Sequence, residues 1–173
     1  LRPEAVSLGV REIVPDAAHE IEAAKFFDWM RKERILPQFI LYSAEEVARF
    51  ADLVARGVVP PGRHLVLFVL GRYTAGQKSE PADVVPFLTA NRENRPWSIC
   101  AFGAREAACA MAAATLGGHA RVGFENNMLL PNGRVAPDNA ALIDVAARGV
   151  ASFGRPVANA AQARELMVSY AWN

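Results

Sequence analysis

The sequence is poor in the residues that build metal and redox sites. It has two cysteines, Cys100 and Cys109, and three histidines, His19, His64 and His119, each isolated from the others. Two cysteines form neither a disulfide framework nor a paired-cysteine metal site. We therefore expect both thiols to be reduced and buried, in a cytoplasmic protein.

The chain also lacks the patterns by which proteins bind nucleic acids, membranes and nucleotides. Its net charge is +1, and its Lys and Arg residues are scattered rather than gathered into a basic stripe with aromatic residues. No apolar run is long enough to span a bilayer. No glycine-rich dinucleotide fingerprint follows the first predicted strand, and no phosphate-binding loop occurs.

Strand-like and helix-like segments alternate along the 173 residues, 52% of which are hydrophobic, as expected for one globular domain. Strands are predicted over 5–10, 36–42, 64–70, 97–102 and 117–127. Helices are predicted over 17–33, 43–56 and 104–116, from about 81, and from about 138 and 160. Such alternation predicts parallel strands, in an open doubly wound sheet or in part of a closed α/β barrel. The missing dinucleotide fingerprint favours the barrel.

The segment GGHARVGFENN, residues 117–127, carries the strongest functional signal. Read as a strand, it places its polar residues His119, Arg121 and Glu125 on one face and its apolar residues on the other. Glu125 falls at the carboxyl end, where barrel enzymes gather catalytic groups. An extended chain separates Arg121 from Glu125 by roughly 13 Å, so each is predicted to have a different partner. The pattern alone is compatible with a structural or a functional role for the two.

Several segments together resemble the β-keto acid cleavage enzymes. They are RPEAVSLG, FVLG, WSICAFG, GGHARVGFENN with LLPNG behind it, and GRPVANAAQAREL, and they extend over essentially the whole chain. Members of that family are (β/α)8 TIM barrels. The resemblance implies that residues 1–173 are the C-terminal portion of a single barrel domain, covering roughly strands four to eight, with the N-terminal portion outside the chain.

The resemblance also implies a reaction. A β-keto acid and acetyl-CoA would exchange acyl groups to give acetoacetate and a new acyl-CoA, with a zinc ion that polarises the keto oxygen. Glu125 matches the family's glutamate ligand of zinc, which works with a His-x-His pair. Arg121 matches a catalytic arginine that acts with the acidic residue after that glutamate. The family further implies a homo-oligomer.

Three positions depart from the family pattern. The chain has no His-x-His pair, so the other zinc ligands come from outside it or no zinc is bound. The acidic residue after the glutamate is Asn126, whose amide cannot act as a base, and Asn126→Asp is predicted to raise activity. The second strand reads LPQFILYS, in which Gln38, Ile40 and Ser43 bring no charge to positions that are commonly acidic.

Four further residues are candidates, of which only Ser7 keeps two interpretations. Ser7 alternates away from Val6 and Leu8, so it either holds a substrate carboxylate or is a packed hydroxyl. His64 is predicted to be a polar group at a strand edge, and His119 a structural hydrogen-bonding residue. Cys100 has no identifiable base partner, which argues against a nucleophile. The alternative to an enzyme is a non-catalytic barrel relative that binds an anion through Arg121 or serves assembly.

Overall fold

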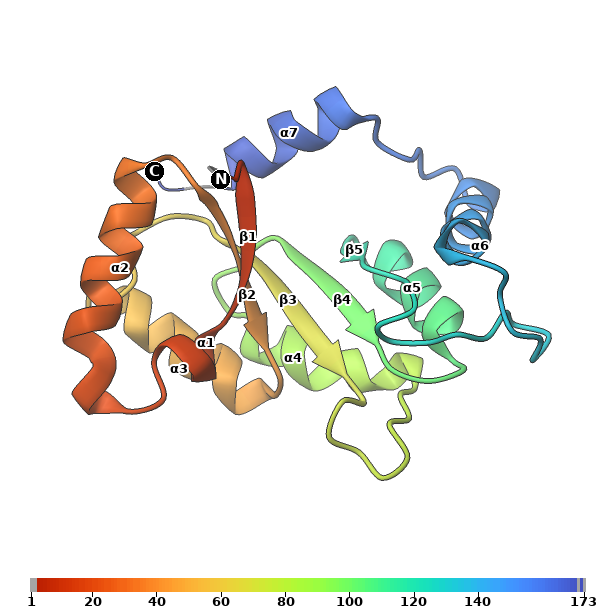
Figure 1. The fold of residues 1–173 in the computed structure, drawn as a ribbon, viewed down its shortest axis with the longest axis horizontal. Coiled ribbons are helices and arrows are strands. Elements are labelled where there is room, and N and C mark those ends of the chain that lie inside the picture. The colour runs from red at the N-terminus through yellow and green to blue at the C-terminus, as the bar shows by residue number, and fades with distance from the viewer. Residues whose placement is uncertain (1–2, 171, 173) are drawn as a thin grey trace. The chain divides into compact units, whose positions relative to one another are not determined.

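The computed structural model describes residues 3–170 and 172, which form an α/β fold around a parallel five-stranded sheet (Figure 1). The sheet has the order β1-β2-β3-β4-β5, the order of the strands in the chain. Register is given by the pairing of Ser7 with Gln38 between β1 and β2, and of Ser98 with His119 between β4 and β5. The strands are β1 (Ala5–Gly9), β2 (Leu36–Leu41), β3 (Leu65–Leu70), β4 (Trp97–Ala101) and β5 (His119–Ala120).

Helices connect the strands, as the alternating pattern predicts. They are α1 (Val10–Ile13), α2 (Glu20–Lys32), α3 (Ala44–Ala55), α4 (Val84–Ala90), α5 (Glu106–Thr115), α6 (Asn139–Ser152) and α7 (Ala160–Ser169), with short 3₁₀ turns η1 (Ala17–His19) and η2 (Pro81–Asp83). The helix starts predicted at 17, 43 and about 138 agree with the structure, in which the side chains of Asp16, Ser43 and Asp138 accept backbone N–H groups of the first turn. None of the helices described is both long and apolar enough to cross a membrane.

The chain divides into two compact units, and each has its own core. The first comprises the residues up to 67, 86–96 and those from 160 onward. Its centre is a row of aromatic rings, with Phe27 and Phe39 5.7 Å apart and Phe39 and Phe50 4.6 Å apart between centroids. His64 directly precedes β3, in line with its prediction as a polar group at a strand edge, and it belongs to this core, being 0% exposed. The reason is that its ring packs edge-on against Phe39 and Trp172 while its Nε2 hydrogen-bonds the Pro60 carbonyl.

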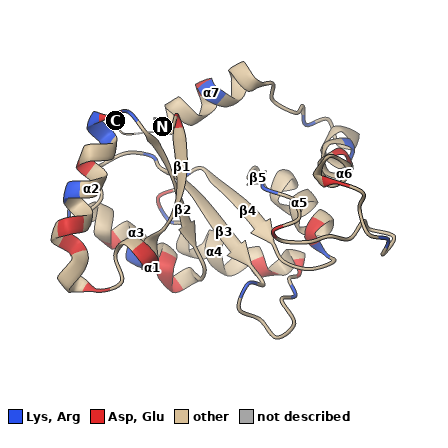
Figure 2. Ribbon diagram, in the orientation of Figure 1, with Lys and Arg blue, Asp and Glu red and all other residues tan. Residues whose placement is uncertain are grey.

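The second unit comprises residues 68–85 and 97–159. The rings of Phe68 and Trp97 stack at 5.8 Å, and Gly118 lies so close to Trp97 that a Cβ there would meet the ring at 2.4 Å. Cys100 and Cys109 are both free and buried, which confirms their prediction. Strands β3 and β4 carry no charged residue (Figure 2), as expected of strands that are buried on both faces.

The last strand is much shorter than the sequence indicates. Only His119 and Ala120 pair with β4, and the chain from Arg121 onward leaves the sheet after one more ladder bond, from Arg121 N–H to the Ile99 carbonyl. The prediction of a strand over 117–127 was therefore wrong. The physical cause is that the backbone N–H groups of 123 and 124 bind side chains of neighbouring helices, and those of 126 and 127 bind the carbonyl of Gly123, instead of a strand.

Candidate active site

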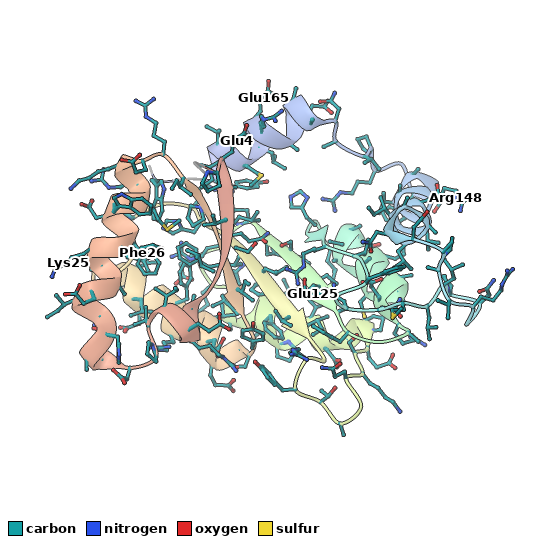
Figure 3. All side chains as sticks on the ribbon, viewed as in Figure 1. Glu4, Lys25, Phe26, Glu125, Arg148 and Glu165 are labelled. Carbon is teal, nitrogen blue, oxygen red and sulfur yellow. The ribbon has the colours of Figure 1, made fainter. Side chains whose placement is uncertain are left out.

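The segment between β5 and α6 folds into a tight loop, residues 121–127, that carries three of the four predicted site residues. The Gly123 carbonyl accepts hydrogen bonds from the backbone N–H groups of Asn126 and Asn127, at 2.9 and 3.1 Å. Glu125, which Figure 3 labels, lies within this turn. The loop follows the carboxyl end of β5, which is the end at which α/β enzymes place catalytic groups.

The turn brings Arg121 and Glu125 together. Arg121 Nη2 lies 3.3 Å from Glu125 Oε1, in place of the roughly 13 Å of an extended strand. The expectation that each has a different partner was wrong, because it assumed a straight chain between them. The side chain of Glu125 is 71% exposed and that of Arg121 36%, so solvent weakens the attraction between them. The pair can open at small cost, which leaves a cation and a carboxylate available to a ligand.

Two helix termini hold the loop in place. On one side, the Asn139 side chain at the start of α6 accepts a hydrogen bond from the Phe124 N–H at 2.8 Å. Gly123 makes this contact possible, since its φ is +147° and a Cβ there would lie 2.9 Å from Asn139 Oδ1. Only glycine adopts such a backbone conformation without strain. On the other side, the loop is bound by Glu106, the first residue of α5.

Glu106 is a site residue that the sequence reasoning missed. Its side chain is buried, and its Oε1 accepts the Gly123 N–H at 3.0 Å while its Oε2 accepts Nδ2 of Asn127 at 3.3 Å. Burial raises the pKa of this carboxyl, and the hydrogen bonds from the loop offset part of that rise. The available signal was the acidic residue that follows Arg105 at the start of the small-residue helix AREAACAMAAATL, whose remaining residues carry no charge.

Asn126 points into the same hydrogen-bond network. Its Nδ2 donates to Glu106 Oε1 at 3.5 Å and to the Arg121 carbonyl at 3.4 Å, and its backbone carbonyl accepts the Gly103 N–H at 3.1 Å. The residue is 7% exposed, and Oδ1 is a buried atom that has no hydrogen-bond partner among the described residues. The hydrogen bonds of Nδ2 thus hold the Asn126 side chain, while Oδ1 accepts none from the described residues.

Cys100 lies on β4, and its thiol is close to the guanidinium of Arg121. Burial raises the pKa of the Cys100 thiol to about 11, and the nearby Arg121 guanidinium offsets only part of this effect. The thiol is therefore protonated near neutral pH. This agrees with the sequence argument against a cysteine nucleophile.

A cavity of about 390 Å³ adjoins Arg121 within the second unit. Its walls come from α5, β5 and α6, and they are mostly alanine and valine side chains, with His119 and Arg155 among the polar groups. A larger cavity, of about 1180 Å³, lies in the first unit between α2 and α7 and includes none of the predicted site residues. The smaller cavity is therefore the one relevant to the chemistry of Arg121.

Ser7 lies in the first unit, on β1. Its Oγ donates a hydrogen bond of 2.9 Å to Oε1 of Gln38, the residue that it pairs with on β2. The Ser7 side chain is exposed, so the hydroxyl is not a packed core group. A neutral hydroxyl–amide pair thus stands on this strand face, and Gln38 is one of the positions at which the sequence lacks the expected charge.

The donor atoms of the described residues do not make a zinc site by themselves. Across residues 3–170 and 172, no three His, Cys, Asp or Glu side chains are grouped as a metal site requires. Catalytic zinc is commonly held by three protein ligands. Glu125 offers one accessible carboxylate, so the described residues fit at most one position of such a site.

Comparison with known proteins identifies the relatives of this chain. The family model described as beta-keto acid cleavage enzyme matches residues 1–168. The 3-keto-5-aminohexanoate cleavage enzyme of Acetoanaerobium sticklandii is 29% identical over 96% of this chain and 62% of its own length. The 3-oxoadipate:acetyl-CoA acetyltransferase of Cupriavidus necator is 28% identical over 96% of this chain and 61% of its own. The chain thus spans about three fifths of the length of these relatives, and it belongs to the β-keto acid cleavage enzyme family.

Proposed function

We propose that the protein cleaves a β-keto acid by acyl exchange with acetyl-CoA, giving acetoacetate and a new acyl-CoA. The family match and the names of the two relatives support this reaction class. The observation that carries the proposal is the Arg121–Glu125 pair, held at the carboxyl end of the sheet by a loop that buried polar groups fix.

Each proposed site residue has a distinct role. Arg121 binds the substrate anion or the negative charge that develops on its oxygen, because a guanidinium offers several donors in one plane. Ser7 holds the substrate carboxylate with its exposed hydroxyl. Asn126 is part of the catalytic centre as a hydrogen-bonding group, since its amide cannot take a proton as a carboxylate does.

Glu125 is proposed as one ligand of a zinc ion in the complete protein. Its accessible carboxylate supports this role, and the other ligands would have to come from outside the residues described. Acetyl-CoA is the proposed co-substrate, in line with the acetyltransferase relative.

The wider architecture is also a proposal. A closed (β/α)8 barrel would contain residues 1–173 as its C-terminal portion, with β1 to β5 as roughly the fourth to eighth strands. The parallel sheet and the family support this arrangement. A homo-oligomer in the cytoplasm completes the proposal.

One observation favours a second candidate, a relative that binds an anion without catalysing the reaction. Asn126 stands where the family has an acid, and its amide is engaged by Glu106 and the Arg121 carbonyl. A protein of this kind would retain the Arg121 cation for a ligand or for assembly and would lack turnover.

The decisive test is an assay of the full-length protein with acetyl-CoA and a panel of β-keto acids that differ in chain length and terminal charge. Mass spectrometry would follow acetoacetate and the new acyl-CoA together, because their equal formation distinguishes acyl exchange from simple thioester hydrolysis. Turnover of at least one substrate, lost in Arg121→Ala, is expected. Saturable anion binding without turnover across the panel would favour the second candidate.

A further inference from the structure

Glu106 is a buried charge that the proposed reaction does not yet use. It begins α5 and is only 2% exposed, within a helix whose other buried residues are alanine and cysteine. Removing a carboxylate from water is costly unless hydrogen bonds compensate it. The loop that Glu106 contacts must therefore supply hydrogen bonds to its carboxylate.

Three donors of the loop converge on this one side chain. The Gly123 N–H and the Asn126 amide both reach Oε1, at 3.0 and 3.5 Å, and the Asn127 amide reaches Oε2 at 3.3 Å. A carboxylate accepts hydrogen bonds at both oxygens, whereas a glutamine in its place has one acceptor and turns an NH₂ group toward a donor. The loop therefore matches a carboxylate and does not match its neutral isostere.

The carboxylate also decides which way the Asn126 amide points. Both groups near its Nδ2, the Glu106 carboxylate and the Arg121 carbonyl, are acceptors only. The amide is therefore held with NH₂ toward Glu106, and its Oδ1 faces away from that pair. Oδ1 is buried and is therefore an acceptor for which the described residues provide no donor.

We propose that Glu106 is a positioning residue of the site, which acts through Asn126 by fixing the orientation of its amide and the turn that carries Glu125. Glu106 and Asn126 form one carboxylate–amide pair, with the charge on the helix and the amide on the loop. The effect on turnover rests on the proposed function, whereas the effect on the loop does not.

The pairing changes what is expected of Asn126→Asp. Alone, this substitution places two carboxylates against each other, and like charges at such a distance cannot both remain ionised without cost. The single variant is thus expected to gain no activity, in contrast to the gain that the family pattern predicts. The exchanged pair, Glu106→Gln with Asn126→Asp, restores one carboxylate and one amide.

The experiment compares Glu106→Gln, Asn126→Asp and the double variant in the full-length protein. Glu106→Gln is expected to lower kcat about tenfold with little change in KM, and to speed hydrogen exchange of the peptide that contains residues 121–127. In the double variant, both kcat and the hydrogen-exchange rate of this peptide are expected to return most of the way to wild-type values. Glu165→Gln, on an exposed position of α7 that Figure 3 labels, is the matched control and should change neither quantity.

Each outcome decides the proposal. Unchanged loop exchange in Glu106→Gln would overturn the positioning role, and a double variant no better than Glu106→Gln would exclude Asn126 as the residue through which it acts. If Glu106→Gln does not fold, Asn126→Ala removes the same hydrogen bond from the loop side, and an unchanged kcat there would overturn the proposal. If the wild-type protein cleaves no β-keto acid, the proposed function fails, while the exchange data still decide the role of Glu106 in the loop.

Discussion

Arg121 Nη2 and Glu125 Oε1 lie 3.3 Å apart on a loop that turns back on itself between the two residues. An exposed ion pair of this kind contributes about 0–1 kcal/mol to folding, because water and salt screen it. Its geometry instead depends on the buried contacts beneath it, from Glu106 and Asn139 to the loop backbone. The two charges can therefore change partners on ligand binding while the loop stays in place.

This relationship leads to a prediction for Arg121→Lys. The substitution keeps the positive charge and loses the planar fork of donors, so acetyl-CoA-dependent cleavage is expected to fall about 100-fold. The melting temperature should change little, since the affected ion pair with Glu125 is exposed and contributes little to stability. Steady-state kinetics and a thermal melt of the same preparation check both statements.

Arg148→Lys is the matched control, because Arg148 is an exposed arginine whose partner, Asp144, lies on the same helix α6. It should leave both activity and melting temperature near wild type. A large loss of stability in Arg121→Lys, with activity preserved, would show that Arg121 is a structural residue.

Glu125→Ala tests the proposed metal ligand. In the full-length protein, metal analysis is expected to show zinc in the wild type and a sharp decrease in the variant, because one of the few protein ligands is removed. Glu165→Ala, on an exposed glutamate, should keep its zinc. The 173-residue chain alone is expected to bind no zinc tightly, and stoichiometric tight binding by that chain would contradict the assignment.

The sequence predicts those features of the structure whose hydrogen-bond partners lie near each other in the chain. Helix starts at Ser43 and Asp138 depend on donors three residues away, and the pattern predicts them correctly. The end of β5 depends on Glu106, which lies 17 residues before the Gly123 N–H that it binds. No periodicity within 117–127 contains that contact, so the segment reads as a longer strand than it forms.

The same limit explains His64 and the Arg121–Glu125 pair. His64 is polar at the start of an apolar run, but its surroundings include Trp172, far along the chain. The family resemblance correctly identifies the family, because residue identity carries that information, and the site residues that it implies stay predictions. The distance between the side chains depends on the turn at Gly123, whose φ the sequence does not reveal.

Gly123→Ala is predicted to destabilise the protein by about 1–3 kcal/mol. Its φ of +147° disfavours any side chain, and the new Cβ would press on Asn139 Oδ1 at 2.9 Å. Gly133→Ala is the control, since Gly133 has a φ of +81° and no atom within 4 Å of an added Cβ. Denaturant unfolding should give a smaller loss for Gly133→Ala, of about 1 kcal/mol. Equal losses would show that the contact with Asn139 contributes nothing.

The last prediction concerns His64 and acid. Burial is the main cause that lowers the pKa of this imidazole to about 4, and the nearby Arg95 adds to it. The unfolded chain, with a pKa near 6.5, therefore binds a proton more readily than the folded one does, and the free energy of unfolding must fall as pH decreases from about 6.5 to about 4. The difference in pKa corresponds to roughly 3 kcal/mol.

Denaturant unfolding of the wild type and of His64→Gln at a series of pH values checks this prediction. Glutamine is neutral throughout, so the variant should lose this part of the acid dependence, whatever its stability at neutral pH. His19→Gln is the control, because His19 is an exposed histidine that pairs with Asp16 at the surface. If His64→Gln retains the full slope between pH 6.5 and 4, the acid sensitivity arises from other groups and the buried imidazole is not its source.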